Sequence, residues 1–296
     1  MIGRGPFETT ERAAAPETPT WRAGRRAVPL ERPFVLGILN LTPDSFSDGG
    51  RLPSVEAALE AALRMEAEGA DAIDVGGEST RPGSEPVPVE EEMRRVLPFL
   101  ERAQGRLGVP LSIDTTKYEV ARAALDAGAE IVNDISGLRF EPRLGELAAE
   151  RGAGLILMHL RGAPRTMQQS IHYDDVVGEV TAELGAALER ARAAGCRDEQ
   201  LAVDPGIGFA KRAEHNLALL NRLDALAVLG RPILVGPSRK SFIGKSVDLP
   251  VDERLEGTLA ACVVALLRGA RLFRVHDVRP IRRGLDLAES IRRAQA

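Results

Sequence analysis

Eight short apolar stretches of the chain are each followed by a side chain that can bind a ligand or carry a proton. The stretches read FVLGIL, AIDVGG, LSI, EIV, GLILM, LAV, ILVG and LFRV. The polar residues that follow them are, in order, Asn40, Glu78, Asp114, Asn133, His159, Asp204, Ser238 and His276. This regular placement is typical of a site assembled from the ends of many strands.

The apolar stretches and the segments between them predict the strands and helices that position these polar groups. Most of the stretches are rich in Val, Ile and Leu, as strands buried on both faces are. Longer segments with apolar residues at three- and four-residue spacing separate them, and residues 55–69 are one example. Strand–helix alternation repeated eight times predicts a (β/α)8 TIM barrel, in which the ends of all eight strands surround one mouth.

Length and composition limit the class of protein. The chain has 296 residues and a net charge of −4, which fits one barrel domain of about 250 residues over residues 33–296 and argues against a nucleic-acid-binding surface. Residues 1–32 show no periodic apolar pattern, so we expect a disordered extension that can be deleted with little loss of turnover. No apolar run is long enough to span a membrane. The two cysteines have neither metal-ligand nor disulfide spacing, which favours a cytoplasmic protein.

Two loops of the expected catalytic face are rich in Gly, Pro and Ser. Residues 40–50, NLTPDSFSDGG, form a longer βα connection than the usual two to six residues, which indicates a lid or substrate loop. The alternative is an ordinary turn. Residues 76–92 contain Arg81 next to a Pro-Gly turn, where a guanidinium suits anion binding. A solvated surface arginine is the competing interpretation.

Three strand ends supply hydrogen-bond acceptors. Asp114 and Asp204 are carboxylates, and Asn133 adds an amide. Together they suit a planar heterocycle with several N–H donors, because a carboxylate accepts two adjacent donors. Each could instead cap the following helix, where Asp and Asn are favoured.

Cations follow the last two strands. Ser238, Arg239 and Lys240 come after the seventh, and Arg274 and His276 are two residues apart in the eighth, so they point the same way. Loops at these positions of a TIM barrel frequently hold phosphate. The histidines lack zinc-site spacing, but Mg²⁺ carried by a phosphorylated substrate needs few protein ligands.

Lysine is rare in this arginine-rich chain. The lysines are Lys117, Lys211, Lys240 and Lys245. A lysine retained against such a background merits attention, although chance accounts for one or two of them.

Taken together, the segments resemble the dihydropteroate synthase family, the sulfonamide-sensitive enzymes of folate synthesis. The matching segments are NLTPDSFSDGG, GGESTRPG, SIDT, NDISG, LMHLRGAPRTMQ, DPGIGF, SRKSFIG and RVHDV, in this order. The resemblance implies a transferase that joins 6-hydroxymethyl-7,8-dihydropterin pyrophosphate to 4-aminobenzoate. The products would be dihydropteroate and pyrophosphate, and the cofactor Mg²⁺.

The resemblance also assigns roles. The pterin would be held by Asp114, Asn133, Asp204, Lys240, Met158 and Gly236. The pyrophosphate would be bound by Asn40, Arg81, Arg274 and His276, with Asn40 also near Mg²⁺. The aminobenzoate would contact Thr80, Arg81, Phe46, Phe209 and Ser238. The loops would close through Asp44, Asp48 and Arg81.

One departure and three further expectations accompany the resemblance. Ala210 stands where the family usually has a glycine, which bears on the backbone of that loop. A folate-binding methyltransferase domain would share the pterin acceptors but needs no pyrophosphate site, and an inactive pterin-binding paralogue is the other alternative. Residues 255–270 are apolar on more than one helix face, so we expect a homodimer.

Overall fold

Eight parallel strands form the centre of the molecule. The structure is a computed structural model that describes residues 20–42 and 54–294. The strands are β3 (Phe34–Asn40), β4 (Ala72–Gly76), β5 (Leu111–Asp114), β6 (Ile131–Asp134), β7 (Gly154–Met158), β8 (Leu201–Asp204), β9 (Leu234–Val235) and β10 (Leu272–Val275). Neighbouring strands pair in the order β8-β7-β6-β5-β4-β3-β10-β9, and a bridge between Val203 and Ile233 joins the two ends. The predicted TIM barrel is confirmed, and its strands are those expected from the sequence.

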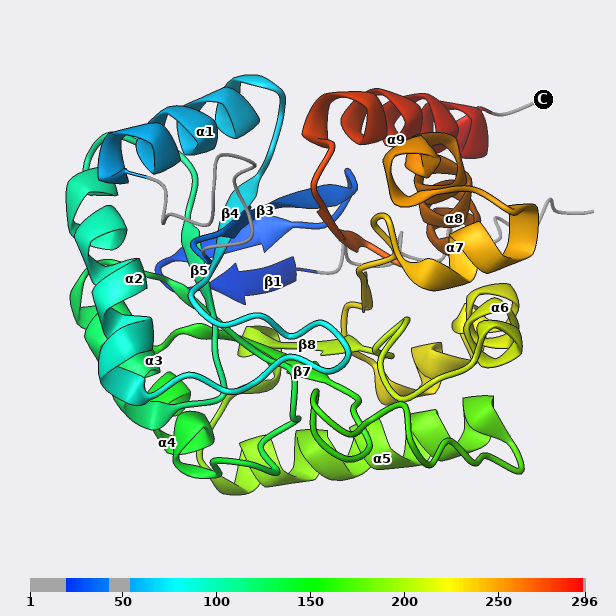
Figure 1. Ribbon diagram of the computed structural model, residues 1–296, viewed down its shortest axis with the longest axis horizontal. Coiled ribbons are helices and arrows are strands. Elements are labelled where there is room, and N and C mark those ends of the chain that lie inside the picture. Colours follow the sequence, from blue (N-terminus) through cyan, green and yellow to red (C-terminus); the bar gives the residue numbers. More distant parts are fainter. Residues whose placement is uncertain (1–19, 43–53, 295–296) are drawn as a thin grey trace, which may run out of the picture.

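The helices surround this barrel (Figure 1). They are α1 (Val55–Ala67), α2 (Val89–Ala103), α3 (Tyr118–Asp126), α4 (Arg143–Arg151), α5 (Val176–Ala193), α6 (Ala213–Asn221), α7 (Ser241–Val247), α8 (Leu255–Leu267) and α9 (Val278–Arg293), with short 3-10 turns at Asp198–Gln200, Leu223–Leu229 and Val251–Glu253. Ser54 caps α1 by accepting from Ala57 N at 3.1 Å, and Gly152 ends α4 in the left-handed region. Within the described residues, no helix is both long and apolar enough to cross a bilayer.

Alternate residues of most strands face two different apolar clusters. One cluster packs the strands against the helices and includes Val35, Ile73, Ile113, Val132, Leu155, Val203 and Phe273. The other fills the lower barrel with the residues one position away, including Leu36, Ala72, Ile131, Ile156, Ala202, Leu234 and Leu272. Because side chains alternate along a strand, the inward positions two residues further along point into the upper barrel, where the polar residues stand.

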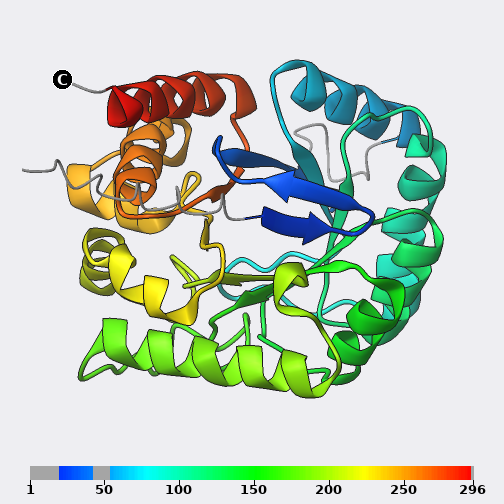
Figure 2. The ribbon, with the colours of Figure 1, turned by 180° about the vertical axis from the view of Figure 1, so that it is seen from behind.

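The N-terminal segment corrects one expectation. Residues 20–32 are not a disordered extension, because β1 (Thr20–Ala23) and β2 (Arg26–Pro29) form an antiparallel hairpin. Figure 2 shows the hairpin lying across the barrel end opposite the mouth. Trp21 is fully buried there, packs edge-on against Phe34 at 5.8 Å and donates from Nε1 to Gln200 O at 3.0 Å. A segment this short shows no periodicity, although it closes the core. Residues 1–19 lie outside the described residues.

Candidate active site

An arginine between two carboxylates occupies the upper barrel. Arg274 on β10 donates from Nε to Asp74 Oδ2 at 2.5 Å and from Nη2 to Asp114 Oδ2 at 2.7 Å. Asn133 on β6 donates from Nδ2 to the same oxygen of Asp74 at 3.2 Å. The four side chains come from four strands, and all occupy inward positions of the register. The sequence-predicted Asp114, Asn133 and Arg274 are therefore brought into one cluster.

Three buried oxygen atoms in and beside the cluster accept no hydrogen bond from any described residue. Asp114 Oδ1, Asp74 Oδ1 and Ser112 Oγ are buried and have no hydrogen-bond partner among the described residues. Burial raises the pKa of Asp114 to about 7, although the charge of Arg274 opposes this. An unpartnered buried carboxylate oxygen is costly, so a ligand N–H at this position would stabilise the ionised form.

The fourth acceptor lies across the barrel beside a lysine. Asp204 ends β8, is 5% exposed and accepts from Gly206 N at 2.7 Å; burial raises its pKa. Lys240 donates to the carbonyl of Ile207, and its Nζ lies 4.4 Å from the ring centroid of Phe209. Burial lowers the pKa of Lys240 to about 8, opposed by Asp204.

A glycine leaves space between the two site cations. A Cβ at Gly236 would lie 3.6 Å from Arg274 Cβ and 3.9 Å from Lys240 Nζ. Any larger side chain would narrow the barrel between these two groups. The sequence-predicted Gly236 thus lines the same space as the two cations.

A serine and a histidine meet at the outer edge of the site. Ser238 Oγ lies 3.0 Å from His276 Nδ1 and accepts from His276 N at 3.2 Å. Burial lowers the pKa of His276 to about 4, and the charges of Arg274 and Arg239 add to the effect. Arg239 does not face the site as an unpaired cation, because it forms a two-bond ion pair with Asp277.

The segment between β4 and α2 crosses the front of the barrel, over its mouth (Figure 1). Its tip is tied down by Gly83 N, which donates to Pro164 O at 3.1 Å. Its base is held by Lys117, which pairs with Glu78 at 2.5 Å and with the buried Glu92. Thr80 is half-buried, whereas Arg81 is exposed and forms no ion pair with any described residue. The charge of Arg81 also depresses the pKa of His276, so the guanidinium lies within electrostatic reach of the site.

The first loop is described only at its start. Asn40 ends β3, and a Cβ at Gly76 would lie 3.5 Å from Asn40 Oδ1 and 3.7 Å from Asp114 Cβ. Gly76 therefore leaves room between the amide and the carboxylate. The predicted Asp44, Phe46 and Asp48 lie outside the described residues.

Comparison with known proteins identifies the family. The model of the family described as "Pterin binding enzyme" matches residues 36–276. The chain is 50% identical over 262 residues to a dihydropteroate synthase of Synechocystis, covering 88% of this chain and 91% of that protein. The structure resembles that of Xanthomonas albilineans dihydropteroate synthase with 4-aminobenzoic acid, with a TM-score of 0.87 and 44% identity over 94% of this chain and all of that one. The chain belongs to the pterin-binding enzyme family, among the dihydropteroate synthases.

A second Xanthomonas albilineans structure, of dihydropteroate synthase in complex with 7,8-dihydropteroate, has a TM-score of 0.84 and 42% identity, and covers 94% of this chain and all of that chain. The resemblance drawn from the sequence motifs is thus confirmed at the level of the family and of the fold.

Two buried polar residues of the site were missed from the sequence, because only the residues at strand ends were considered. Asp74 and Ser112 are each fully buried and face each other across the β4–β5 ladder. Asp74 could have been found from the sequence, because it is a charged residue inside an otherwise apolar strand. In AIDVG, Asp74 stands two positions before Gly76, and therefore on the inward face.

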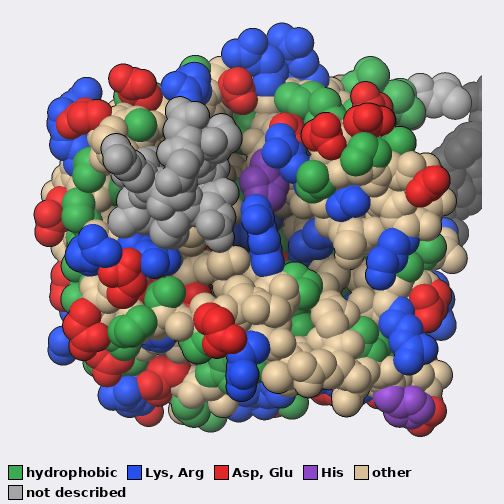
Figure 3. All heavy atoms as spheres, in the orientation of Figure 1, with side chains coloured by type: hydrophobic (Ala, Val, Ile, Leu, Met, Phe, Trp, Pro, Cys, Tyr) green, Lys and Arg blue, Asp and Glu red, His purple; other side chains and the backbone are tan. Residues whose placement is uncertain are grey.

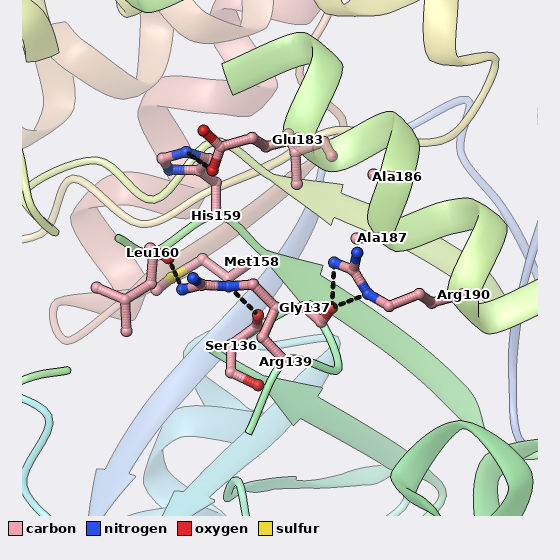
Figure 4. A pocket seen from close by; sticks show the side chains of 11 residues that line it. Ser136, Gly137, Arg139, Met158, His159, Leu160, Glu183, Ala186, Ala187 and Arg190 are labelled. Atoms are coloured by element: carbon pink, nitrogen blue, oxygen red, sulfur yellow. Dashed lines mark hydrogen bonds and ion pairs between the residues drawn. The ribbon is translucent and has the colours of Figure 1, made fainter. Parts of the chain in front are cut away.

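One wall of the site also borders a small cavity. Met158 is 4% exposed and packs with Ile135, Leu160 and Phe209. A cavity of about 80 Å³ lies beside it, between the segment after β6 and α5 (Figure 4). Its polar lining residues include Arg139, His159, Glu183 and Arg190.

Positive and imidazole side chains gather near the middle of the mouth face (Figure 3). Acidic side chains are spread mainly around the rim of this view. Within the described residues, no group of three or more His, Cys, Asp or Glu side chains could hold a metal ion.

Proposed function

We propose that this protein condenses 6-hydroxymethyl-7,8-dihydropterin pyrophosphate with 4-aminobenzoate, giving dihydropteroate and pyrophosphate. The observation that carries the proposal is the free buried oxygen of Asp114 next to Arg274. One edge of the site thus offers an acceptor to N–H groups, and the adjoining edge offers positive charge. A pterin that bears a diphosphate has this same division of donors and negative charge.

The pterin ring is assigned to the deep end of the barrel. Asp114 and Asp204 would accept from ring and amino N–H groups, and Asn133 would add an amide that Asp74 holds in place. Lys240 would supply a donor to a ring acceptor. Met158 and Gly236 would form the wall and the open floor, because one is apolar and the other has no side chain.

The diphosphate is assigned to the cationic edge. Arg274 would bind its oxygens with N–H groups not engaged by the two carboxylates, and neutral His276 would donate a ring N–H. Arg81 and Asn40 would approach from the loops. Reaction breaks the bond between the methylene carbon and the diphosphate oxygen, whose electron pair leaves with pyrophosphate. The amine lone pair forms the new C–N bond, and the amine then loses a proton.

Positive charge is the main catalytic requirement of this reaction. The leaving group gains negative charge in the transition state, so cations beside it accelerate its departure. The arylamine is neutral at pH 7 and needs no strong base. Accordingly, no Ser-His-Asp arrangement is needed.

We also propose that Mg²⁺ accompanies the diphosphate, with Asn40 as its protein ligand. The side-chain oxygen of Asn40 suits this hard cation, and Mg²⁺ commonly keeps water and substrate phosphates as its other ligands. The absence of a three-residue acidic cluster among the described residues fits an ion held largely by substrate. When bound, Mg²⁺ would neutralise the leaving group.

The aminobenzoate is assigned to the outer part of the site. Phe209 would stack on its ring, and Ser238 and Thr80 would bind its polar atoms, with Arg81 near its carboxylate. Because Thr80 and Arg81 belong to the β4–α2 segment and Phe46, Asp44 and Asp48 to the first loop, this pocket needs both loops. We therefore expect aminobenzoate to bind well only after the pterin diphosphate.

The test is pyrophosphate release from the pterin diphosphate, with and without 4-aminobenzoate. We expect release that depends on the amine, together with formation of dihydropteroate. The variant Asp114→Asn should lose most pterin affinity, because it presents donors where the ligand presents donors, and a buried mismatch costs about 1–3 kcal/mol.

A matched control is Asp126→Asn, an exposed change at the end of α3, which should leave turnover unchanged. No release by the folded protein would make it an inactive paralogue. Methyl transfer from a methylated folate would point to the methyltransferase alternative, against which the cationic edge argues.

We further propose a cytoplasmic homodimer. The two cysteines, Cys196 and Cys262, are buried and free, as suits a reducing compartment. Helices α8 and α9 pack together and expose large apolar side chains: Val264, Leu267, Leu287 and Ile291. A second copy covering them would remove this surface from water. A monomeric mass in light scattering at micromolar concentration would contradict the dimer, and Leu267→Asp should weaken it.

A further inference from the structure

A second lysine is buried behind the site and takes no part in the chemistry above. Lys211 is 4% exposed, and its Nζ lies 3.1 Å from Gly206 O, 3.0 Å from Phe209 O and 2.9 Å from His159 Nδ1. An ammonium group has three hydrogens, so these three acceptors use all of them. Burial lowers the pKa of Lys211 to about 7, while Asp204 opposes the shift.

The imidazole of His159 links Lys211 to a helix. Burial lowers the pKa of His159 to about 4, and the charge of Lys211 adds to this, so the ring is neutral at pH 7. With Nδ1 accepting from Lys211, the ring proton lies on Nε2, which faces Glu183 Oε2 at 3.1 Å (Figure 4). Glu183 on α5 is itself held by Arg161 at 2.9 Å. Close polar contacts therefore run from Lys211 through His159 to α5, although His159 Nε2 and Glu183 are at ion-pair distance without hydrogen-bond geometry.

The segment that Lys211 holds carries three elements of the site. Asp204 begins it, the carbonyl of Ile207 accepts from Lys240, and Phe209 ends it beneath the same lysine. Its backbone is also closely confined. Gly206 has a φ of +68°, and a Cβ there would lie 2.0 Å from the carbonyl oxygen of His159. Without Lys211, the carbonyl of Phe209 would lose its donor, and the carbonyl of Gly206 would keep only the bond from Phe209 N at 3.0 Å.

We propose that Lys211 is a positioning residue for the arylamine pocket: by holding the carbonyls of Gly206 and Phe209 it fixes the ring of Phe209 against Lys240. The proposal rests on the proposed function, because it assumes that aminobenzoate stacks on Phe209. We expect arginine to be a poor replacement for Lys211, since its planar group is larger than an ammonium and spreads its donors in a fork. Methionine keeps the length of the side chain and removes the charge.

The first test compares Lys211→Met with Lys245→Met, an exposed lysine of α7, in the full-length enzyme. Lys211→Met should raise the KM for 4-aminobenzoate by about ten- to a hundredfold, as expected for the loss of one or two charged hydrogen bonds. The KM for the pterin diphosphate should rise less, because Asp114, Asn133 and Arg274 are on other strands and only Asp204 and Lys240 of the proposed pterin ligands contact this segment. Lys245→Met should leave both values unchanged.

Equal changes in both KM values, or no change in either, would overturn the positioning role. If Lys211→Met does not fold, His159→Phe breaks the same contacts further from the site and should raise the KM for aminobenzoate in the same sense. When both single variants fold, their effects should not add in the double variant, because they act through one network.

Hydrogen exchange separates this inference from the proposed function. The amides of residues 206–210 should exchange faster in Lys211→Met than in the wild type, whether or not the protein turns over. Wild-type inactivity with this faster exchange would contradict the function but keep the positioning role. Unchanged exchange would remove that role even in an active enzyme.

Discussion

Arg274 Nε donates a hydrogen bond to Asp74 Oδ2 over 2.5 Å in the centre of the barrel. A second bond, to Asp114, ties the same guanidinium to the proposed pterin acceptor. Arginine has five N–H groups, so three remain with no acceptor among the described residues. From the sequence, Arg274 serves the diphosphate alone, whereas in the structure it also sets the charge and position of Asp114. In the proposed site, the pterin and diphosphate halves of the substrate would therefore be coupled through one side chain.

Replacing Arg274 with lysine should weaken the binding of both the pterin ring and the diphosphate. Lys keeps the charge but loses the fork that binds two carboxylates and phosphate oxygens together. We expect catalytic efficiency to fall roughly ten- to a thousandfold, measured by steady-state kinetics. Calorimetry with a pterin that lacks the diphosphate should also show weaker binding. Unaltered bare-pterin affinity would mean that the contact with Asp114 does not matter for the ring.

The N-terminal hairpin should be required for stability. Trp21→Ala removes a fully buried indole from the closed end of the barrel, and such changes cost about 3–5 kcal/mol of unfolding free energy. Urea unfolding measures this cost, with Arg25→Ala in the exposed turn as the control. Deletion of residues 1–32 should likewise destabilise the protein. A truncated protein with wild-type stability would show that the hairpin does not contribute to the core.

Ala210→Gly should stabilise the protein. Ala210 has a φ of +48°, which costs an L-residue about 1–2 kcal/mol. Glycine removes this cost, but the unfolded chain gains about 0.4–1 kcal/mol of entropy, so the net gain should lie between about 0 and 1.6 kcal/mol. The control Ala182→Gly, on the exposed face of α5, should be destabilising instead. The family's usual glycine at this position has the same physical explanation.

The two buried histidines should reduce stability as the pH drops below neutrality, whereas the raised pKa of Asp114 acts in the opposite direction. His159 and His276 have pKa values lowered to about 4 by burial, below the ordinary value of about 6.5. Between these values the unfolded chain binds protons that the folded protein excludes, so the free energy of unfolding decreases with falling pH. The contribution is present above about pH 6.5 and lost towards pH 4. Urea unfolding at pH 7 and pH 5 measures it, and His276→Asn should reduce the slope. An identical slope in that variant would exclude His276 as a source.

The sequence alone determined the barrel and most of its candidate site. Every strand is an apolar run that ends near a polar residue, and two-residue alternation decides which side chains face inward. The positions of Asp114, Asn133, Asp204 and Arg274 followed from that local pattern. The family resemblance followed from the order of the motifs along the chain. Because each motif follows a strand, the same order places the motifs around the mouth of the barrel.

Only the tertiary structure decided which of these groups touch. The contacts of Arg274 with Asp74 and of Lys211 with His159 join residues 200 and 52 positions apart, and no periodic pattern specifies such pairs. The hairpin was missed because two four-residue strands give no periodicity, and Trp21 is buried only once the barrel end exists for it to cover. Arg239, which the sequence placed in the anion site, is instead paired with Asp277. Local pattern fixes the direction of a side chain, whereas packing fixes its partner.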